Sequence, residues 1–145
     1  MIISPLENRD ALEISTKIAG SAMRAQSARM QVVAQNIANA DATASIPDGD
    51  PYARKTVTFK QEMDRNLDAE LVSVRNIGVD RTPFNIRYEP GHPAANEKGF
   101  VKTPNVNVMV ELADMQEANR SFSANVQMIK FTRTLSSMTI DLLRT

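Results

Sequence analysis

The chain has 145 residues, of which 17 are lysine or arginine and 17 are aspartate or glutamate, so its formal net charge is zero. This balance gives no electrostatic reason to expect a nucleic-acid partner, and the absence of cysteine excludes disulfides, zinc–thiolate sites and thiol catalysis. Aromatic residues make up 5% and tryptophan is absent, which is thin for a self-sufficient core. The length fits one domain, or one small domain with long helical extensions.

The N-terminal residues lack the basic start and the continuous apolar stretch of a cleavable signal peptide. No run approaches the roughly eighteen apolar residues that a membrane span needs. On these grounds alone the expected compartment is the cytoplasm. A dedicated export route that leaves the N-terminus intact would leave no trace in this pattern.

The first predicted element is a helix over residues 12–39, where apolar residues recur at alternating spacings of four and three. Asn8 or Asp10 is expected to cap its start, and the turn-forming residues from Ala38 to Thr43 are expected to end it. The apolar stripe consists of Leu12, Ala19, Met23, Met30, Val33 and Ile37, with Thr16 and Gln26 as polar interruptions.

The middle of the chain is predicted to be a small β-rich insert, which follows the turn-dense boundary Ile46–Pro51. Alternation with a period of two predicts three strands, at Lys55–Lys60, Leu71–Ile77 and Phe84–Tyr88. The polar stretch Gln61–Glu70 is expected to be a loop or a mobile hairpin tip. Residues Ala95–Pro104 are expected to be a connection into the last helix.

The last predicted element is a helix over residues 107–143 with two apolar stripes. The first stripe contains Val108, Leu112, Met115, Phe122, Val126 and Ile129, with Asn119 as its polar member. The second stripe contains Ala124, Met128, Phe131, Leu135, Met138 and Leu142. At about 1.5 Å rise per residue the two helices would be roughly 40 Å and 55 Å long. The short insert cannot cover both, so we expect partners in other chains.

The predicted order is therefore an N-terminal helix with its terminating motif at residues 1–46, the insert at 47–104, and a C-terminal helix at 105–145. The fold class is mainly α with a small β-rich insert.

Few residues suggest chemistry. His92 is the only histidine, so no histidine pair can hold a metal or relay protons, and its place between Gly91 and Pro93 is typical of a turn. The Asp48-Gly49-Asp50 segment lacks the later ligands of a calcium loop. We therefore predict no catalytic, cofactor-binding or metal-binding residue.

Three stretches resemble a known family, the rod subunits of the bacterial flagellar basal body. They are Ala25–Thr43 with Asn36-Ile37-Ala38-Asn39-Ala40, Tyr88–Asn107 with Pro90-Gly91-His92-Pro93, and Glu111–Leu143 with Glu117-Ala118-Asn119-Arg120-Ser121-Phe122. The middle stretch is similar to the pattern of FlgC-type proximal-rod subunits and is the most discriminating. Phe100 stands where that family usually has tyrosine, which removes a hydroxyl but keeps the ring.

The resemblance implies a structural protein of the proximal rod, exported by the flagellar apparatus without signal cleavage and stacked helically in the periplasm. It implies terminal helices packed as a coiled coil that lines a tube, with the insert facing outward. The implied partners are copies of itself, other rod proteins and the adaptor between membrane ring and export gate at the rod base. No nucleic acid, small-molecule substrate, cofactor or direct membrane insertion is expected.

The stripes and the resemblance together predict an assembly interface, in which the polar positions Gln26 and Asn119 fix the register between neighbours. Its residues are Met23, Met30, Val33, Asn36, Ile37, Asn39, Leu112, Met115, Asn119, Phe122, Val126, Ile129, Phe131, Leu135 and Met138. Asn36 and Asn39 are also explained by simple helix termination, and the stripes by an internal core. The alternative functions are another axial protein, such as a sister rod subunit or a hook component, or a coiled-coil export chaperone or adaptor. An enzyme is the weakest candidate.

Overall fold

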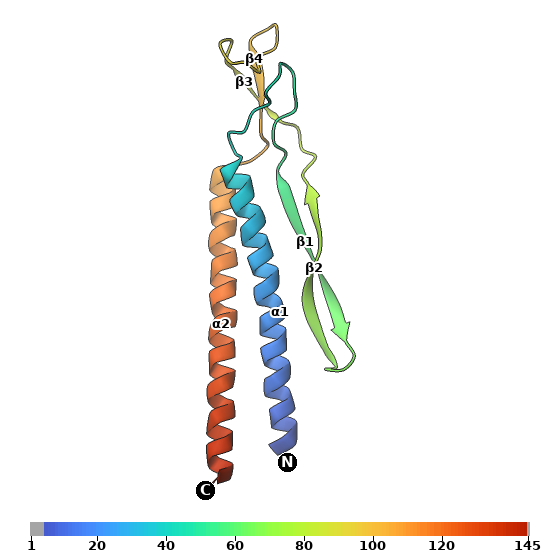
Figure 1. Cartoon of the computed structure of the whole chain (residues 1–145), viewed down its shortest axis with the longest axis vertical. Coiled ribbons are helices and arrows are strands. Elements are labelled where there is room, and N and C mark those ends of the chain that lie inside the picture. The colour runs from blue at the N-terminus through green and yellow to red at the C-terminus, as the bar shows by residue number, and fades with distance from the viewer. Residues whose placement is uncertain (1–4, 145) are drawn as a thin grey trace. The chain divides into compact units, whose positions relative to one another are not determined.

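The computed structural model describes residues 5–144, which form two long helices and four strands (Figure 1). The elements in chain order are α1 (Pro5–Ala38), β1 (Lys55–Asp64), β2 (Ala69–Val79), β3 (Asn85–Tyr88), β4 (Phe100–Thr103) and α2 (Val108–Arg144). This order confirms the predicted helix, small β-rich insert and helix. Within the described part of the chain, neither helix holds an apolar stretch long enough to cross a membrane.

The chain divides into two compact units. Unit 1 contains α1 up to Ala28, residues 59–75 of the β1–β2 hairpin, and α2 from Ala118 onward. Unit 2 contains residues 29–58 and 76–117, and so holds the end of α1, the root of the hairpin, the β3–β4 sheet and the start of α2.

Helix α1 already includes Pro5, so the predicted start at Asn8 or Asp10 was wrong. Proline is favourable in a first turn because its fixed φ suits the helix and its missing N–H has no partner to lose there. The predicted end is confirmed. The backbone N–H of Asn39 donates to the carbonyl of Gln35 at 3.1 Å, and its side-chain Nδ2 donates to the same oxygen at 2.8 Å. Asn39 thus closes the last turn of its own helix.

Strands β1 and β2 form a two-stranded sheet and are longer than predicted. The expected loop Gln61–Glu70 is only a tight turn, because β1 continues to Asp64 and β2 already begins at Ala69. The side chain of Asp64 accepts from the N–H of Asn66 at 2.9 Å, and Asp68 has a positive φ of 47°. Of the two predicted alternatives, a loop or a hairpin tip, the hairpin tip is right. The strands extend further into this stretch than predicted because its mostly exposed residues show no apolar alternation.

Strands β3 and β4 pair antiparallel, with Ile86 opposite Lys102 and Tyr88 opposite Phe100. The predicted connection Ala95–Pro104 was therefore wrong, since its last part is β4, which is too short to show a period of two. The rings of Tyr88 and Phe100 meet edge to face, with centroids 5.3 Å apart. Gly99 precedes β4 with φ of 80°, and a Cβ there would lie 2.9 Å from the Tyr88 ring.

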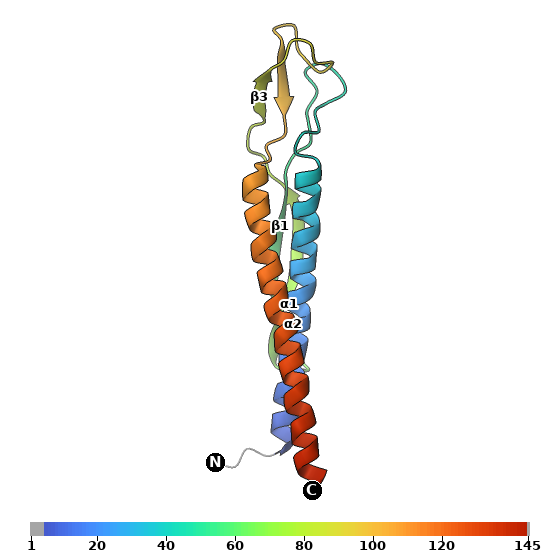
Figure 2. The same cartoon turned by 90° about the vertical axis from the view of Figure 1, so that its left-hand side faces the viewer.

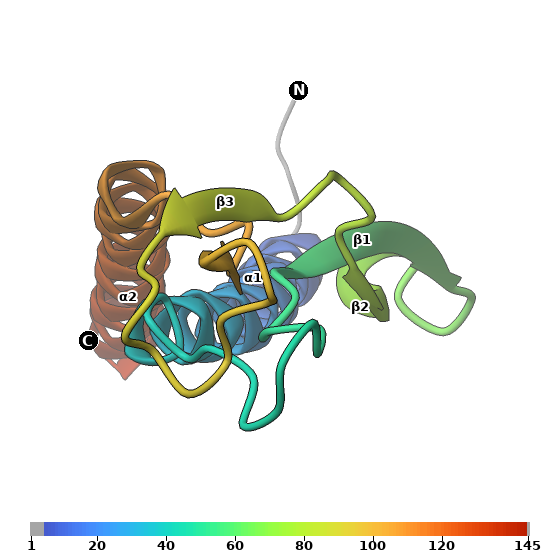
Figure 3. The same ribbon diagram turned by 90° about the horizontal axis from the view of Figure 1, so that it is seen from above.

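The loops of unit 2 flank this small sheet (Figure 3). Lys102 Nζ, on β4, donates to the carbonyl of Asp48 at 3.1 Å and to Asp50 Oδ1 at 3.0 Å. His92 lies in a turn, as predicted: its N–H donates to the Glu89 carbonyl at 3.1 Å and its Nδ1 accepts from the N–H of Ala94 at 3.0 Å.

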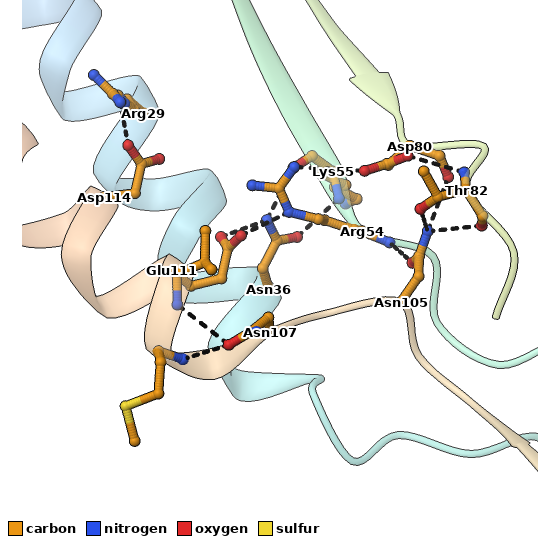
Figure 4. Close-up of polar contacts among 12 residues, drawn as sticks. Arg29, Asn36, Arg54, Lys55, Asp80, Thr82, Asn105, Asn107, Glu111 and Asp114 are labelled. Carbon is orange, nitrogen blue, oxygen red and sulfur yellow. Dashed lines mark hydrogen bonds and ion pairs between the residues drawn. The ribbon is translucent and has the colours of Figure 1, made fainter. Parts of the chain in front are cut away.

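Helix α2 begins at a side-chain cap. Asn107 Oδ1 accepts from the N–H of Met109 at 3.0 Å and of Val110 at 3.3 Å, and the Asn107 carbonyl accepts from the N–H of Glu111 (Figure 4). The predicted start at Asn107 is confirmed. Figures 1 and 2 show that, within unit 2, the start of α2 runs antiparallel to the end of α1.

The fully buried positions of α2 lie beside the predicted first stripe, of which Met115, Phe122, Val126 and Ile129 are half-buried. Glu111 and Ala118 have no exposed surface and Thr132 is buried, whereas Leu112 and Asn119 are exposed. Asn119 is exposed in the single chain, and its predicted role in the register between neighbouring subunits stays a prediction. A pattern search that follows large apolar residues passes over a glutamate, an alanine and a threonine.

Helix α1 buries more than the single predicted stripe. Val33 is buried and Met23, Met30 and Ile37 are half-buried, as the predicted stripe requires. A second covered side includes Ser21, whose Oγ accepts from the N–H of Val72 in the hairpin at 3.2 Å. The buried residues of unit 1 among those described are small: Ala19, Ser21, Ala25, Ala69, Ala118 and Thr132. Such a core supplies little apolar area.

Removing the cap of α2 tests this reading of its start. Asn107→Ala should lower the free energy of unfolding by about 1 kcal/mol, because two N–H groups lose their acceptor. Asn107→Asp keeps the acceptor and should be near neutral. Urea unfolding of both variants measures the difference; equal stability of Asn107→Ala and wild type would contradict the cap assignment.

Candidate assembly interface

The centre of unit 2 is a polar network around Asn36, near the end of α1 (Figure 4). Its Oδ1 accepts from the N–H of Lys55 at 2.8 Å and from the hydroxyl of Tyr52 at 2.9 Å. Its Nδ2 donates to the carbonyl of Lys55 at 2.8 Å and to Glu111 Oε2 at 2.9 Å. All the hydrogen-bonding capacity of the carboxamide is therefore used. Two of the four bonds go to the backbone N–H and carbonyl of Lys55, the first residue of β1, as bonds from a neighbouring strand would.

Glu111, on the first turn of α2, is the charged member of the network and has no exposed surface. Its second oxygen, Oε1, accepts from Arg54 Nε at 2.7 Å. A buried carboxylate is stable only when it is paired and hydrogen-bonded, and here each oxygen has a donor. Glu111 therefore fixes the start of α2 against both the end of α1 and the segment that leads into β1.

The charges of the network support one another. Burial opposes the charge on Arg54, but its hydrogen bond to Glu111 and the negative charges of Glu111 and Asp80 outweigh this and raise its pKa. Burial first, and then the charge of Glu111, raise the pKa of the Tyr52 phenol. Arg54 stays charged and Tyr52 stays a donor toward Asn36 at ordinary pH.

Asn105 extends the network to the end of β2. Its Oδ1 accepts from the N–H of Arg54 at 2.8 Å, and its Nδ2 donates to the Asp80 carbonyl at 3.3 Å and the Thr82 carbonyl at 3.1 Å. Hydrogen bonds from Thr82, and more weakly the nearby Arg54, lower the pKa of the Asp80 carboxyl. Outside this network, an ion pair between Arg29 on α1 and Asp114 on α2 also joins the two helices.

This network holds the segments of unit 2 together, and its acids are already occupied by protein donors. Among the residues that the structure describes, no group of three or more His, Cys, Asp or Glu side chains is placed to hold a metal ion. Sequence reasoning missed Glu111, Arg54, Tyr52 and Asn105 because isolated polar residues carry no periodic signal.

The predicted interface residues fall into four groups. Asn36 and Val33 are buried inside unit 2, and Asn39 bonds within its own helix. Half-buried are Met23, Met30, Ile37, Met115, Phe122, Val126, Ile129 and Leu135. Exposed are Leu112, Asn119, Phe131 and Met138. Whether any of them meets another chain stays a prediction.

The most exposed apolar side chains of α2 lie at its two ends. In unit 1, Phe131 is 60% exposed and Met138 56%, with Met128, Ile140 and Leu142 also exposed. In unit 2, Met109 is 75% exposed and Val110 53%, beside the exposed Val108 and Leu112. The second predicted stripe is thus uncovered in the single chain, apart from the half-buried Leu135. Contiguous exposed apolar surface of this kind marks interaction sites.

The lowered pKa of Asp80 predicts a pH dependence of stability. Because the folded state favours the charged form, the contribution of Asp80 is fully present above the ordinary carboxyl pKa of about 3.9 and is lost as the pH falls through the lower folded value. Asp80→Asn should therefore reduce the loss of stability below about pH 4. Urea unfolding at a series of pH values measures this. If the free energy of unfolding falls as steeply below about pH 4 in Asp80→Asn as in the wild type, the prediction is wrong.

Two sequence models of protein families match the chain. "Flagella basal body rod protein" matches residues 17–44 and "Flagellar basal body rod FlgEFG protein C-terminal" matches residues 97–142. These matches cover most of α1 and nearly all of α2.

Curated relatives match over almost the whole chain, and three of them are described as flagellar basal-body rod protein FlgC. The protein of Agrobacterium fabrum is 53% identical over 135 residues, which is 93% of this chain and 97% of the relative. That of Escherichia coli O157:H7 is 40% identical over 86% of this chain and 92% of the relative. That of Borreliella burgdorferi is 30% identical over 90% of this chain and 96% of the relative. The chain therefore belongs to the FlgC family of flagellar basal-body rod proteins.

Proposed function

We propose that this protein is a structural subunit of the proximal rod, which polymerises helically through its terminal helices into a torque-transmitting shaft around a channel. The observation that carries this proposal is the uncovered apolar stripe of α2, in a chain that belongs to a rod-protein family. A subunit that transmits torque needs side-by-side contacts that resist sliding, and long apolar stripes provide them.

The magnitudes favour a continuous interface. Burying one exposed Phe or Met side chain contributes about 1.5–3 kcal/mol. Association costs about 4–15 kcal/mol in lost freedom of motion. A single residue cannot offset that cost, whereas Met128, Phe131, Met138 and Leu142 together can, if one neighbour covers them.

Two observations support an arrangement like that of a coiled coil. The inward positions of α2 recur every seven residues, at Glu111, Ala118, Asn125, Thr132 and Thr139, all buried or half-buried. Gln26 Oε1 is buried without a hydrogen-bond partner among the described residues. An unpaired acceptor is costly, and a donor from a neighbouring chain would satisfy it, which fits the predicted role of Gln26 in register.

The finer parts of the proposal concern place and partners. The partners are copies of this chain, other rod proteins and the adaptor at the rod base, and the location is the periplasmic rod, reached by export without signal cleavage. The relatives' names support the basal-body rod. The insert faces outward, because the helices supply the apolar stripes through which subunits would pack. The protein is not an enzyme and takes no cofactor.

The alternative axial proteins are less well supported. The C-terminal family match is described for FlgE, FlgF and FlgG proteins, so by itself it favours no one subunit type. The relatives named FlgC span the insert as well, including the Gly91-His92-Pro93 segment. A coiled-coil chaperone would not need the well-formed β1–β2 and β3–β4 sheets.

Phe131→Asp tests the exposed stripe. The side chain is already 60% exposed, so the fold should survive, but a carboxylate in a dry seam is strongly disfavoured and rods should not form. Ser137→Asp is the matched control, because it adds the same charge at an exposed position on another face of the same helix. Half-buried Phe122 and Ile129 are less suitable, because their substitution also disturbs the fold.

The readouts are secretion of the variant and electron microscopy of detergent-extracted basal bodies from cells lacking the wild-type gene. We expect normal export of both variants, rods with Ser137→Asp and none with Phe131→Asp. Normal rods built from Phe131→Asp would show that the stripe is not an assembly surface.

A further inference from the structure

We propose that Asn36 is the positioning residue that couples pairing of the helix ends to docking of the hairpin root in unit 2, so that the two events form one cooperative step. This concerns the folding of the free subunit and does not depend on the proposed function.

The geometry assigns this role because one carboxamide joins segments that are far apart in sequence. Tyr52 and Lys55 lie 16 and 19 positions from Asn36, and Glu111 lies 75 positions away. Asn36 is 1% exposed, so water cannot replace a missing partner. An aspartate would lack both donors and a leucine all four bonds, which leaves asparagine as the residue that fits.

The coupling follows from the cost of half-formed states. If α2 pairs while Lys55 is undocked, Asn36 retains a buried donor and acceptor without partners. If Lys55 docks while α2 is unpaired, Arg54 loses the carboxylate of Glu111 and Asn36 Nδ2 loses one of its two acceptors. Each unsatisfied buried group is costly, so intermediate states are disfavoured relative to both the fully formed and the fully open network.

The test uses Asn36→Asp in the full-length subunit. It places a second carboxylate beside Glu111, in surroundings whose other charged and titratable groups are Arg54, Asp80, Tyr52 and the Lys55 ammonium, which itself donates to Gln35. Two adjacent carboxylates raise one pKa strongly, because they cannot both ionise without a large cost. At neutral pH we expect amides of residues 52–58 and 107–114 to exchange with deuterium about tenfold or more faster, and to do so together.

Lowering the pH from 8 to 5 should restore protection in Asn36→Asp, because a shared proton returns the missing donor between residues 36 and 111. Asn39→Asp is the matched control: its side chain bonds only to Gln35 of its own helix, so it should show little loss and no recovery in this range. A purely structural loss of packing would not be reversed by acid.

The double variant Asn36→Asp with Glu111→Gln completes the test. The new glutamine amide can donate to the aspartate while its oxygen still accepts from Arg54, so protection should return in large part and lose its pH dependence. Loss of protection in only one of the two segments would overturn the proposal. So would a double variant whose amides in these segments exchange as fast as those of Asn36→Asp alone. If Asn36→Asp does not fold at neutral pH, the double variant decides in the same way.

Discussion

Unit 2 depends on the burial of one carboxylate. Glu111 has no exposed surface, and it is stable there because Arg54 and Asn36 each donate to one of its oxygens. Breaking a buried pair by removing one partner typically costs about 3–5 kcal/mol, a large fraction of the stability of a small domain. The end of α1, the start of α2 and the root of the hairpin are therefore held by polar contacts of defined geometry rather than by a large apolar core.

The same interaction sets which face of α2 is turned inward. With Glu111 inside, helical geometry places Leu112, Met109 and Val110 toward solvent, and all three are exposed. The seven-residue spacing then carries small or polar residues, such as Ala118 and Thr132, along the inward face. Other large apolar residues of this helix, among them Met128, Phe131 and Met138, are left on its outer faces.

The helices, their order and the end of α1 could be predicted from the sequence, because apolar spacing and turn-forming residues mark them clearly. The hairpin was found, but the far ends of its strands were not, since most of Gln61–Asp64 is exposed and shows no apolar alternation. Strand β4 is four residues long and was missed. Long-range pairing, which forms these strands, leaves little trace in a local pattern.

The candidate site could be predicted only in part. The second stripe of α2 was identified because its residues are large and apolar, and the structure leaves most of it uncovered. In the first stripe Met115, Phe122, Val126 and Ile129 are half-buried, whereas Leu112 is exposed and its neighbour Glu111, which the predicted stripe did not include, is buried. The role of Asn36 was not predictable from its neighbours, since its partners Tyr52, Lys55 and Glu111 are brought to it by the fold.

We propose that the outer stripe of α2 becomes covered when subunits assemble. Because the chain has no cysteine, Met138→Cys provides a single thiol on that stripe. Labelling with a maleimide should be rapid in the purified subunit and strongly suppressed in detergent-extracted basal bodies that contain the same variant. Equally rapid labelling in the two states would contradict the account.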